Sequence, residues 1–221
     1  MGAGERALEF IESGQTLGLG TGRAASAFIE RLAERVKAGL RIRGVPTSER
    51  SARLAQGLGI PLVGLEEAGT LDLCVDGADE VDPQLNLIKG YGGALVREKI
   101  VAASARKLVI LVGPEKLVPT LGARGRLPVE IVPFGLSLAM RRLHALGCEP
   151  RLRMDGVAPY LTDNGNHILD CGIRPLEDPA RFESDLKAIP GLVGSGLFLG
   201  MADVVIVEDG GRVEVRRRAT A

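Results

Sequence analysis

The segment 75–82, VDGADEVD, contains four carboxylates in a stretch of seven residues. It directly follows a hydrophobic run at 71–74. The four carboxylates are Asp76, Asp79, Glu80 and Asp82. In isolation, such a segment most simply forms a solvated loop whose acids cap helices. An EF-hand is excluded because Ala78 stands where a calcium loop needs Asp or Asn. The carboxyl end of a parallel strand is also where α/β proteins bind ligands, so the segment is a candidate site.

A lysine, a glycine-rich turn and a glutamate follow the acidic segment. Lys89 begins the sequence KGYGG, and Glu98 follows in a predicted helix over residues 93–105. The residues three or four positions from Glu98 are apolar, which would place this acid on an apolar stripe of the helix. Arg97 and Lys99 have similarly apolar neighbours, so the spacing leaves open which of the three charges is buried and which is exposed or paired.

The glycine-rich segment 18–22, GLGTG, joins a predicted strand to a predicted helix. Backbone N–H groups and the positive end of a helix dipole could bind a phosphate there. The segment is not a dinucleotide fingerprint, because its third glycine is misplaced, and it is not a Walker loop, because no Gly-Lys-Ser/Thr follows. A tight turn that needs glycine only for its backbone is the alternative. The residues that favour a small phosphate ester are Arg23 and the hydroxyl residues Thr21, Ser26, Thr47 and Ser48.

These residue types meet the requirements of proton transfer between adjacent carbons of a sugar. That reaction needs one base that takes and returns the proton, and donors that stabilise a developing enediolate oxygen. A semi-buried glutamate can be the base, and a lysine with a glycine-rich backbone can supply the donors. The remaining carboxylates can accept hydrogen bonds from sugar hydroxyls.

The elements that must position these residues follow a βαβ pattern in the first half of the chain. The predicted strands are 15–20, 41–47, 71–79 and 107–113, and the predicted helices are 24–39, 48–59 and 93–105. The fold class is therefore α/β, with a Rossmann-like, mostly parallel sheet and helices on both faces. The acidic segment then lies at the edge of the sheet where ligands bind.

The pattern changes after about residue 124. Strands predicted at 127–134, 149–154 and 159–173 alternate with helices at 136–147 and 178–191, which predicts a small α+β unit of ferredoxin-like type. The apolar run 202–208 then returns as a strand of the first unit. We therefore predict an α/β catalytic domain over 1–125, completed by 198–221, and an inserted small domain over 126–197.

The overall composition excludes several classes of function. Lys plus Arg and Asp plus Glu number 28 each, so no net charge favours nucleic acid or an anionic membrane. No apolar run approaches the roughly 18 residues of a membrane span, and residues 1–14 begin as an amphipathic helix instead of a secretory signal, so we expect a cytoplasmic protein. The three cysteines are expected to be reduced, structural thiols. We expect Arg216, Arg217 and Arg218 to form a solvated chain end.

Six segments together point to a known family: GLGTGRAA, GVPTSERS, DGADEVD, IKGYGGALVREKI, PVEIVPFG and GLFLGMAD. Through them the chain resembles ribose-5-phosphate isomerase of the A type over nearly its whole length, and DGADE with KGxGGAxxREK is far more specific than the glycine loop. The resemblance implies interconversion of ribose 5-phosphate and ribulose 5-phosphate through an enediolate, without metal or cofactor, in the pentose phosphate pathway. It also implies a homodimer or tetramer with the small domain as the interface.

The resemblance assigns roles to residues of this sequence. Glu98 would be the base, and Asp76 and Asp79 would handle sugar hydroxyls and ring opening. Lys89 would hold substrate oxygens. The other predicted substrate contacts are Gly20, Thr21, Gly22, Arg23, Ala24, Thr47, Ser48, Gly77, Ala78, Gly90, Tyr91, Gly92 and Lys116.

The sequence departs from the family's pattern at two places. The family's phosphate loop usually reads Gly-Thr-Gly-Ser-Thr, whereas Arg23 and Ala24 replace the two hydroxyl residues here. Arg23 could compensate through a charge-assisted contact with the phosphate. Tyr91 stands where the family often has glycine or another residue. Neither departure involves the proposed base.

Two alternatives come from other functional classes. A non-catalytic sugar-phosphate sensor domain would share the fold, but such a regulator carries a DNA-binding helix-turn-helix, and the single short helix before residue 15 leaves no room for one. An acyl or coenzyme A transferase would keep a glycine-rich loop and a glutamate but would have no use for DGADE. The fold alone does not separate these classes, and the polar residues favour the isomerase.

Removal of metal ions should leave turnover of ribose 5-phosphate intact, because the sequence offers neither a His/Cys cluster nor EF-hand spacing. The measurement is activity after dialysis against a chelator. Loss of turnover that one divalent ion restores would contradict this prediction and would make the acids of the segment 75–82 metal ligands.

Overall fold

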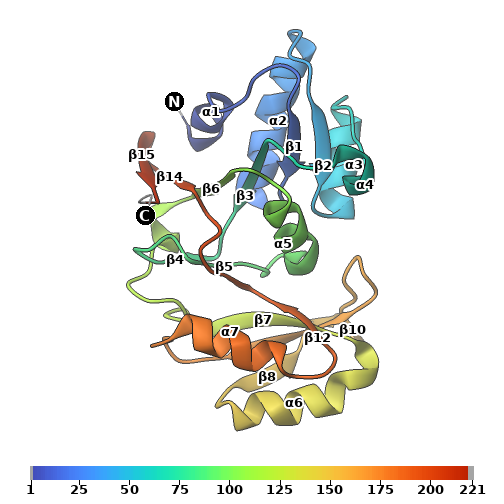
Figure 1. The fold of residues 1–221 in the computed structure, drawn as a ribbon, viewed down its shortest axis with the longest axis vertical. Coiled ribbons are helices and arrows are strands. Elements are labelled where there is room, and N and C mark those ends of the chain that lie inside the picture. Colours follow the sequence, from blue (N-terminus) through green and yellow to red (C-terminus); the bar gives the residue numbers. More distant parts are fainter. Residues whose placement is uncertain (1, 219–221) are drawn as a thin grey trace.

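A six-stranded sheet with the order β15-β14-β6-β3-β1-β2 forms the centre of the larger part of the molecule (Figure 1). The computed structural model describes residues 2–218. The strands from β14 to β2 are parallel, and β15 is antiparallel to β14. The strands are β1 (Thr16–Leu19), β2 (Arg43–Pro46), β3 (Leu73–Gly77), β6 (Leu108–Val112), β14 (Val204–Asp209) and β15 (Arg212–Arg217).

Helices cover both faces of this sheet, as the α/β pattern predicts. Alternate strand residues point to opposite faces, so Val75 packs with Phe28 of α2 while Cys74 packs with Val101 of α5. The first face carries α1 (Ala3–Leu8), α2 (Arg23–Lys37) and α3 (Glu49–Gly57). The second face carries α5 (Leu95–Ala103), and the short α4 (Leu65–Ala68) follows α3 in the chain.

A small antiparallel sheet with the order β13-β5-β4 connects the larger part to the rest of the molecule. It consists of β4 (Glu80–Val81), β5 (Leu87–Ile88) and β13 (Leu197–Phe198). The sequence pattern predicted only a turn between residues 79 and 93. The β4–β5 hairpin forms there because Asp82 accepts hydrogen bonds from the amides of Gln84 and Asn86.

The second unit is a four-stranded antiparallel sheet with the order β12-β7-β11-β8. Its sequence order, β7-α6-β8-β11-α7-β12 with β7 and β11 central, is the ferredoxin-like arrangement that was predicted. The elements are β7 (Arg126–Ile131), α6 (Leu136–Ala145), β8 (Glu149–Leu152), β11 (His167–Gly172), α7 (Pro179–Lys187) and β12 (Leu192–Ser195). A hairpin of β9 (Met154–Asp155) and β10 (Ala158–Pro159) extends from it, and the 3-10 turns are η1 (Pro114–Lys116) and η2 (Pro133–Gly135).

Helix α5 lies between the six-stranded sheet and the second unit (Figure 1). One face of the four-stranded sheet packs on α6 and α7 through residues such as Val129, Leu143 and Leu186. Strand β13 marks the passage between the two parts, because Leu197 packs in the core of the second unit and Phe198 in that of the larger part. The proposed division at residues 125/126 and 197/198 stays a prediction.

Expectations drawn from the composition have different outcomes. Cys74, Cys148 and Cys171 are free and buried thiols, as expected. Within residues 2–218, no helix has the length and apolar character that crossing a membrane requires. The expectation of a solvated chain end was wrong, because Arg216 and Arg217 belong to β15. Arg218 donates hydrogen bonds of 2.9 Å to the carbonyls of Ala202 and Leu85.

Candidate active site

A cavity of about 430 Å³ lies at the carboxyl ends of the parallel strands β1, β3 and β6. Most of the predicted site residues line it, together with four residues that were not predicted. The lining consists of Thr21, Gly22, Arg23, Ala24, Gly77, Ala78, Asp79, Lys89, Gly90, Gly92, Glu98, Leu111, Val112, Gly113, Glu115 and Lys116. The cavity therefore combines the segments that the sequence analysis singled out separately.

Lys89 is buried between two carboxylates at the inner end of the cavity. Its Nζ lies 3.0 Å from Asp76 Oδ2 and 3.4 Å from Glu98 Oε2, and it donates a hydrogen bond of 2.6 Å to the carbonyl of Gly77. None of the three charged residues is more than 3% exposed. The contacts with the carboxylates are ion pairs, and no group within residues 2–218 hydrogen-bonds to Asp76 Oδ2 or Glu98 Oε2. Both oxygens are buried, and the ammonium of Lys89 is the charged group that each of them faces.

The charges of this cluster set the protonation of its members. Burial raises the pKa of Glu98 to about 8, the ammonium of Lys89 acts against this shift, and Asp76 and Asp79 add to it. Burial disfavours the charge on Lys89, but attraction by Asp76 and Glu98 outweighs this effect and raises the pKa of Lys89 above its ordinary value. The cluster thus contains a permanent cation and a carboxyl group that titrates close to neutrality.

Asp76 lies behind the cavity wall and is held by backbone amides. Its Oδ1 accepts hydrogen bonds from the amide of Thr21 at 3.0 Å and from its neighbour Gly77 at 2.7 Å. A Cβ atom on Gly20 would lie 2.3 Å from the same oxygen. Gly20, predicted as a substrate contact, is not part of the cavity lining. Its missing side chain allows the Asp76 carboxylate to approach the turn closely.

Asp79 stands on the cavity wall. Its Oδ2 accepts a hydrogen bond of 3.0 Å from the amide of Tyr91, and its Oδ1 lies 4.0 Å from Lys116 Nζ. The side chain of Tyr91 points away from the cavity, because its hydroxyl donates to the carbonyl of Arg126 at 3.3 Å. The structure thus brings Asp79, Lys116 and the backbone of residues 90–92 together.

The other two acids of the segment 75–82 have structural roles. Glu80 is fully buried and accepts hydrogen bonds from the amides of Gly122 and Arg124, and Asp82 holds the β4–β5 hairpin. Two of the four carboxylates therefore belong to the site and two fix the surrounding chain. Within residues 2–218, no three side chains of His, Cys, Asp or Glu gather as metal ligands would.

The beginning of α2 forms the opposite side of the cavity. Gly22, Arg23 and Ala24 line it there, and the first N–H groups of a helix have no partners within the helix. Arg23 is exposed and lies at the first position of the helix. This end of the cavity can accept an anionic group through N–H donors, the helix dipole and the cations of Arg23 and Lys116.

Thr47 and Ser48, predicted as substrate contacts, lie behind this turn and outside the cavity lining. Their hydroxyl oxygens are each 2.7 Å from Oγ1 of Thr21, and both residues are buried. Ser51, which the sequence analysis did not single out, completes the cluster by donating to the carbonyl of Gly20 at 2.6 Å. These hydroxyls are used to support the turn that carries Thr21.

The lining residues that were not predicted lie in the last two positions of β6 and directly after it. They are Leu111, Val112, Gly113 and Glu115. Their signal was present, because residues 107–113 were predicted as a strand of the same parallel sheet, whose carboxyl end must reach the same edge.

The sequence matches the family described as ribose 5-phosphate isomerase A (phosphoriboisomerase A) over residues 43–211. Ribose-5-phosphate isomerase A from Roseiflexus castenholzii is 53% identical over 208 residues, which are 93% of this chain and 89% of the relative. The protein of the same name from Gloeobacter violaceus is 52% identical over 214 residues, covering 96% and 93%.

Solved structures of the same family are similar over the whole fold. A D-ribose-5-phosphate isomerase in complex with phospho-erythronic acid has a TM-score of 0.94 at 40% identity, covering 98% of this chain and 96% of its own. Ribose 5-phosphate isomerase A from Methanocaldococcus jannaschii has a TM-score of 0.93 at 37% identity, covering 97% and 96%. The mixed, mostly parallel sheet and the additional antiparallel unit are thus both shared.

Gly20→Ala should reduce turnover of ribose 5-phosphate, because the new Cβ would collide with Asp76 Oδ1 and displace the carboxylate that pairs with Lys89. A displacement of about 1 Å in such a cluster can cost about 10²-fold in rate. The matched control is Gly57→Ala, where a Cβ meets nothing within 4 Å. Steady-state kinetics of both variants check this prediction, and equal kcat in the two proteins would contradict it.

Proposed function

Because the chain belongs to the ribose 5-phosphate isomerase A family and is an aldose–ketose isomerase, we propose that Glu98 carries the proton between C1 and C2 of the bound sugar phosphate. The observation that carries the proposal is the position of this carboxyl group. It lines the cavity, is only 3% exposed, and lies 3.4 Å from the ammonium of Lys89. A base and a fixed cation thus face the same small volume.

The two ends of the cavity suit the two ends of the substrate. The phosphate of ribose 5-phosphate would bind at the beginning of α2, with Arg23 and Lys116 supplying cations. The carbonyl end would then reach Lys89 and Glu98. The complex of the related isomerase with phospho-erythronic acid supports a ligand of this kind, because a phosphorylated sugar acid carries oxygens where the enediolate carries them.

Asp79 and Asp76 would act before the proton transfer, when the cyclic sugar opens. Asp79 is on the cavity wall and can accept a hydrogen bond from a sugar hydroxyl. Asp76 lies deeper, and its Oδ2 faces Lys89 without a hydrogen bond from residues 2–218. We propose that Asp79 contacts the ring directly, while Asp76 fixes Lys89 and receives a hydroxyl that approaches the ammonium.

The isomerisation itself then requires one proton carrier and a stabilised oxygen. Glu98 takes the proton from C2 of the open aldose, the electron pair forms the C1–C2 double bond, and the carbonyl oxygen on C1 becomes negative. Lys89 and the amides of residues 90–92 stabilise this charge. A proton moves from the oxygen on C2 to the oxygen on C1, and Glu98 returns its proton to C1, which leaves the carbonyl on C2.

The raised pKa values suit these roles. A carboxyl group with a pKa of about 8 is a stronger base than an exposed glutamate and still loses its proton near neutral pH. Lys89, whose pKa lies above its usual value, stays charged in the same range and acts as a fixed cation, not as an acid. The two groups therefore divide proton transfer and charge stabilisation between them.

We also propose a cytoplasmic homodimer or tetramer that uses the second unit as its interface. Of the large apolar side chains that are exposed within residues 2–218, all except Ile100 belong to that unit. They are Val132, Phe134, Met154, Val157, Leu161 and Val193. The concentration of exposed apolar side chains in one unit is what favours that unit as the surface that binds another chain.

Glu98→Gln tests the assignment of the base, because the amide keeps the shape of the side chain but does not accept the proton. We expect kcat to fall by at least the roughly 10² to 10⁴ of lost general base catalysis, while the affinity for phospho-erythronic acid persists. Glu98→Asp keeps a carboxylate base but shortens the side chain by one methylene. Its kcat should lie between the values of the wild-type protein and Glu98→Gln. Near-normal kcat in Glu98→Gln would refute the assignment.

A further inference from the structure

The second unit holds the backbone of residues 90–92, here called the 90–92 loop, from the side opposite the cavity. Arg153, directly after β8, points its Nη1 at two carbonyl oxygens of this loop. The distances are 3.2 Å to the oxygen of Gly90 and 3.2 Å to that of Tyr91. The Arg153 side chain is only 11% exposed, so these contacts are shielded from water.

Arg153 is itself held in place by a carboxylate. Asp170 of β11 accepts from Arg153 Nε at 2.9 Å and from Nη2 at 2.5 Å, which is a bidentate pair. Arg126 donates to the same carboxylate through Nε at 2.9 Å and Nη2 at 2.8 Å, and its guanidinium lies 4.6 Å from the ring of Tyr91. The cluster of two arginines and one aspartate retains one positive charge behind the loop.

The hydrogen bonds from Arg153 to these two carbonyls determine the direction of the amides in the loop. In a planar trans peptide the C=O and the following N–H are directed oppositely. The carbonyls of Gly90 and Tyr91 belong to the same peptide groups as the amides of Tyr91 and Gly92. Held from behind, these amides face the cavity, where Tyr91 N donates to Asp79 and Gly92 forms part of the wall.

Arg153 supplements one internal hydrogen bond of the loop, in which the amide of Gly93 donates to the carbonyl of Gly90 at 3.0 Å. Gly90 has a φ of 103°, and glycine adopts positive φ values about as readily as negative ones. The φ preference of this residue therefore does not fix its conformation. A positive guanidinium at the carbonyl end also polarises each peptide group and makes its N–H a better donor. The contact therefore acts on both the direction and the strength of the amides.

We propose that Arg153, anchored by Asp170, is a positioning residue that aims the amide of Gly92 at the enediolate oxygen and keeps the amide of Tyr91 on Asp79. This inference rests on the proposed role of the 90–92 loop as a donor to that oxygen. Arg153 does not line the cavity and would act only through the loop. The competing explanation is that the arginine merely joins the two parts of the molecule.

The test compares Arg153→Met and Arg153→Lys with the control Arg151→Met. Arg151 lies on the same segment, but its side chain is 82% exposed. We expect kcat of Arg153→Met to fall by about 10-fold to 10²-fold, in the range of one weakened oxyanion donor, with a smaller change in KM. Arg153→Lys should recover only part of the loss, because an ammonium lacks the planar fork of the guanidinium. Arg151→Met should retain wild-type kinetics.

Two further measurements separate positioning from a structural role. Affinity for phospho-erythronic acid should fall by the same factor as kcat/KM, while the acid limb of the pH profile stays unchanged because Lys89 and Glu98 are untouched. Millimolar guanidinium ion should partly restore the Arg153→Met activity. A twofold or smaller loss of kcat, or a loss accompanied by a shifted acid limb and no rescue, would overturn the proposal.

A second variant keeps the test decisive if Arg153→Met does not fold. Asp170→Asn leaves Arg153 in the chain but weakens its anchor. We expect kcat and the affinity for phospho-erythronic acid to fall together, by less than in Arg153→Met, while the acid limb of the pH profile stays unchanged. Wild-type analogue affinity in this variant would count against the proposal. Failure of the base assignment is distinguishable, because Glu98→Gln is expected to lose turnover while keeping analogue affinity.

Discussion

The ammonium of Lys89, buried between the carboxylates of Asp76 and Glu98, is the interaction on which the rest of the site depends. Burying three charges is unfavourable unless they are paired and hydrogen-bonded. The fold provides this through the carbonyl of Gly77 and through the amides that hold Asp76. Burial raises the pKa of Glu98 on the cavity wall, and the cation that it shares with Asp76 offsets this shift only in part. The same cluster thus explains both a stable cation and a base that is active near neutrality.

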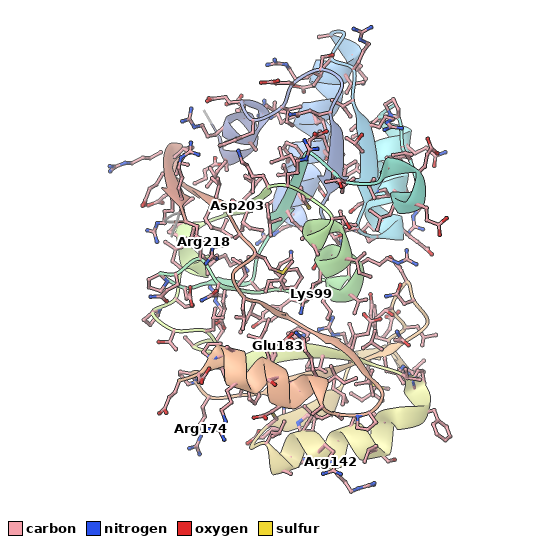
Figure 2. All side chains as sticks on the ribbon, viewed as in Figure 1. Lys99, Arg142, Arg174, Glu183, Asp203 and Arg218 are labelled. Carbon is pink, nitrogen blue, oxygen red and sulfur yellow. The ribbon has the colours of Figure 1, made fainter. Side chains whose placement is uncertain are left out.

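The second unit supports this cluster from outside the six-stranded sheet. Lys89 follows β5, whose neighbour β13 continues directly from the second unit, and its amide donates to the carbonyl of Gly196. Phe198 of β13 lies with its ring 5.5 Å from the ammonium of Lys89 and 5.0 Å from that of Lys99. Lys99 in turn reaches from α5 toward Glu183 of α7, with 3.3 Å between Nζ and Oε1 (Figure 2). The second unit therefore holds Lys89 and α5 in place without lining the cavity.

Much of the fold and of the site could be predicted from the sequence, because periodicity and strand ends are local signals. The parallel order of β1, β3 and β6 brings Thr21, Asp79 and Gly113 to one sheet edge, and a polar residue at a strand end is visible in the sequence. Burial of a particular charge was not visible, since Arg97, Glu98 and Lys99 have equally apolar neighbours and only tertiary packing turns Glu98 inward. The supporting roles of Gly20, Thr47 and Ser48 depend on contacts between distant segments, which spacing does not encode. The β4–β5 hairpin was missed because each strand has only two residues.

The central claim is that burial beside two other carboxylates raises the pKa of Glu98, so that this carboxyl group exchanges its proton close to neutral pH. The most direct test is the infrared difference spectrum between the wild-type protein and Glu98→Gln, recorded as a function of pH. A protonated carboxyl C=O band that is present at neutral pH and disappears with a midpoint near about 8 is the expected result. A band already lost in weakly acidic solution, with a midpoint near the ordinary glutamate value of 4.5, would contradict it.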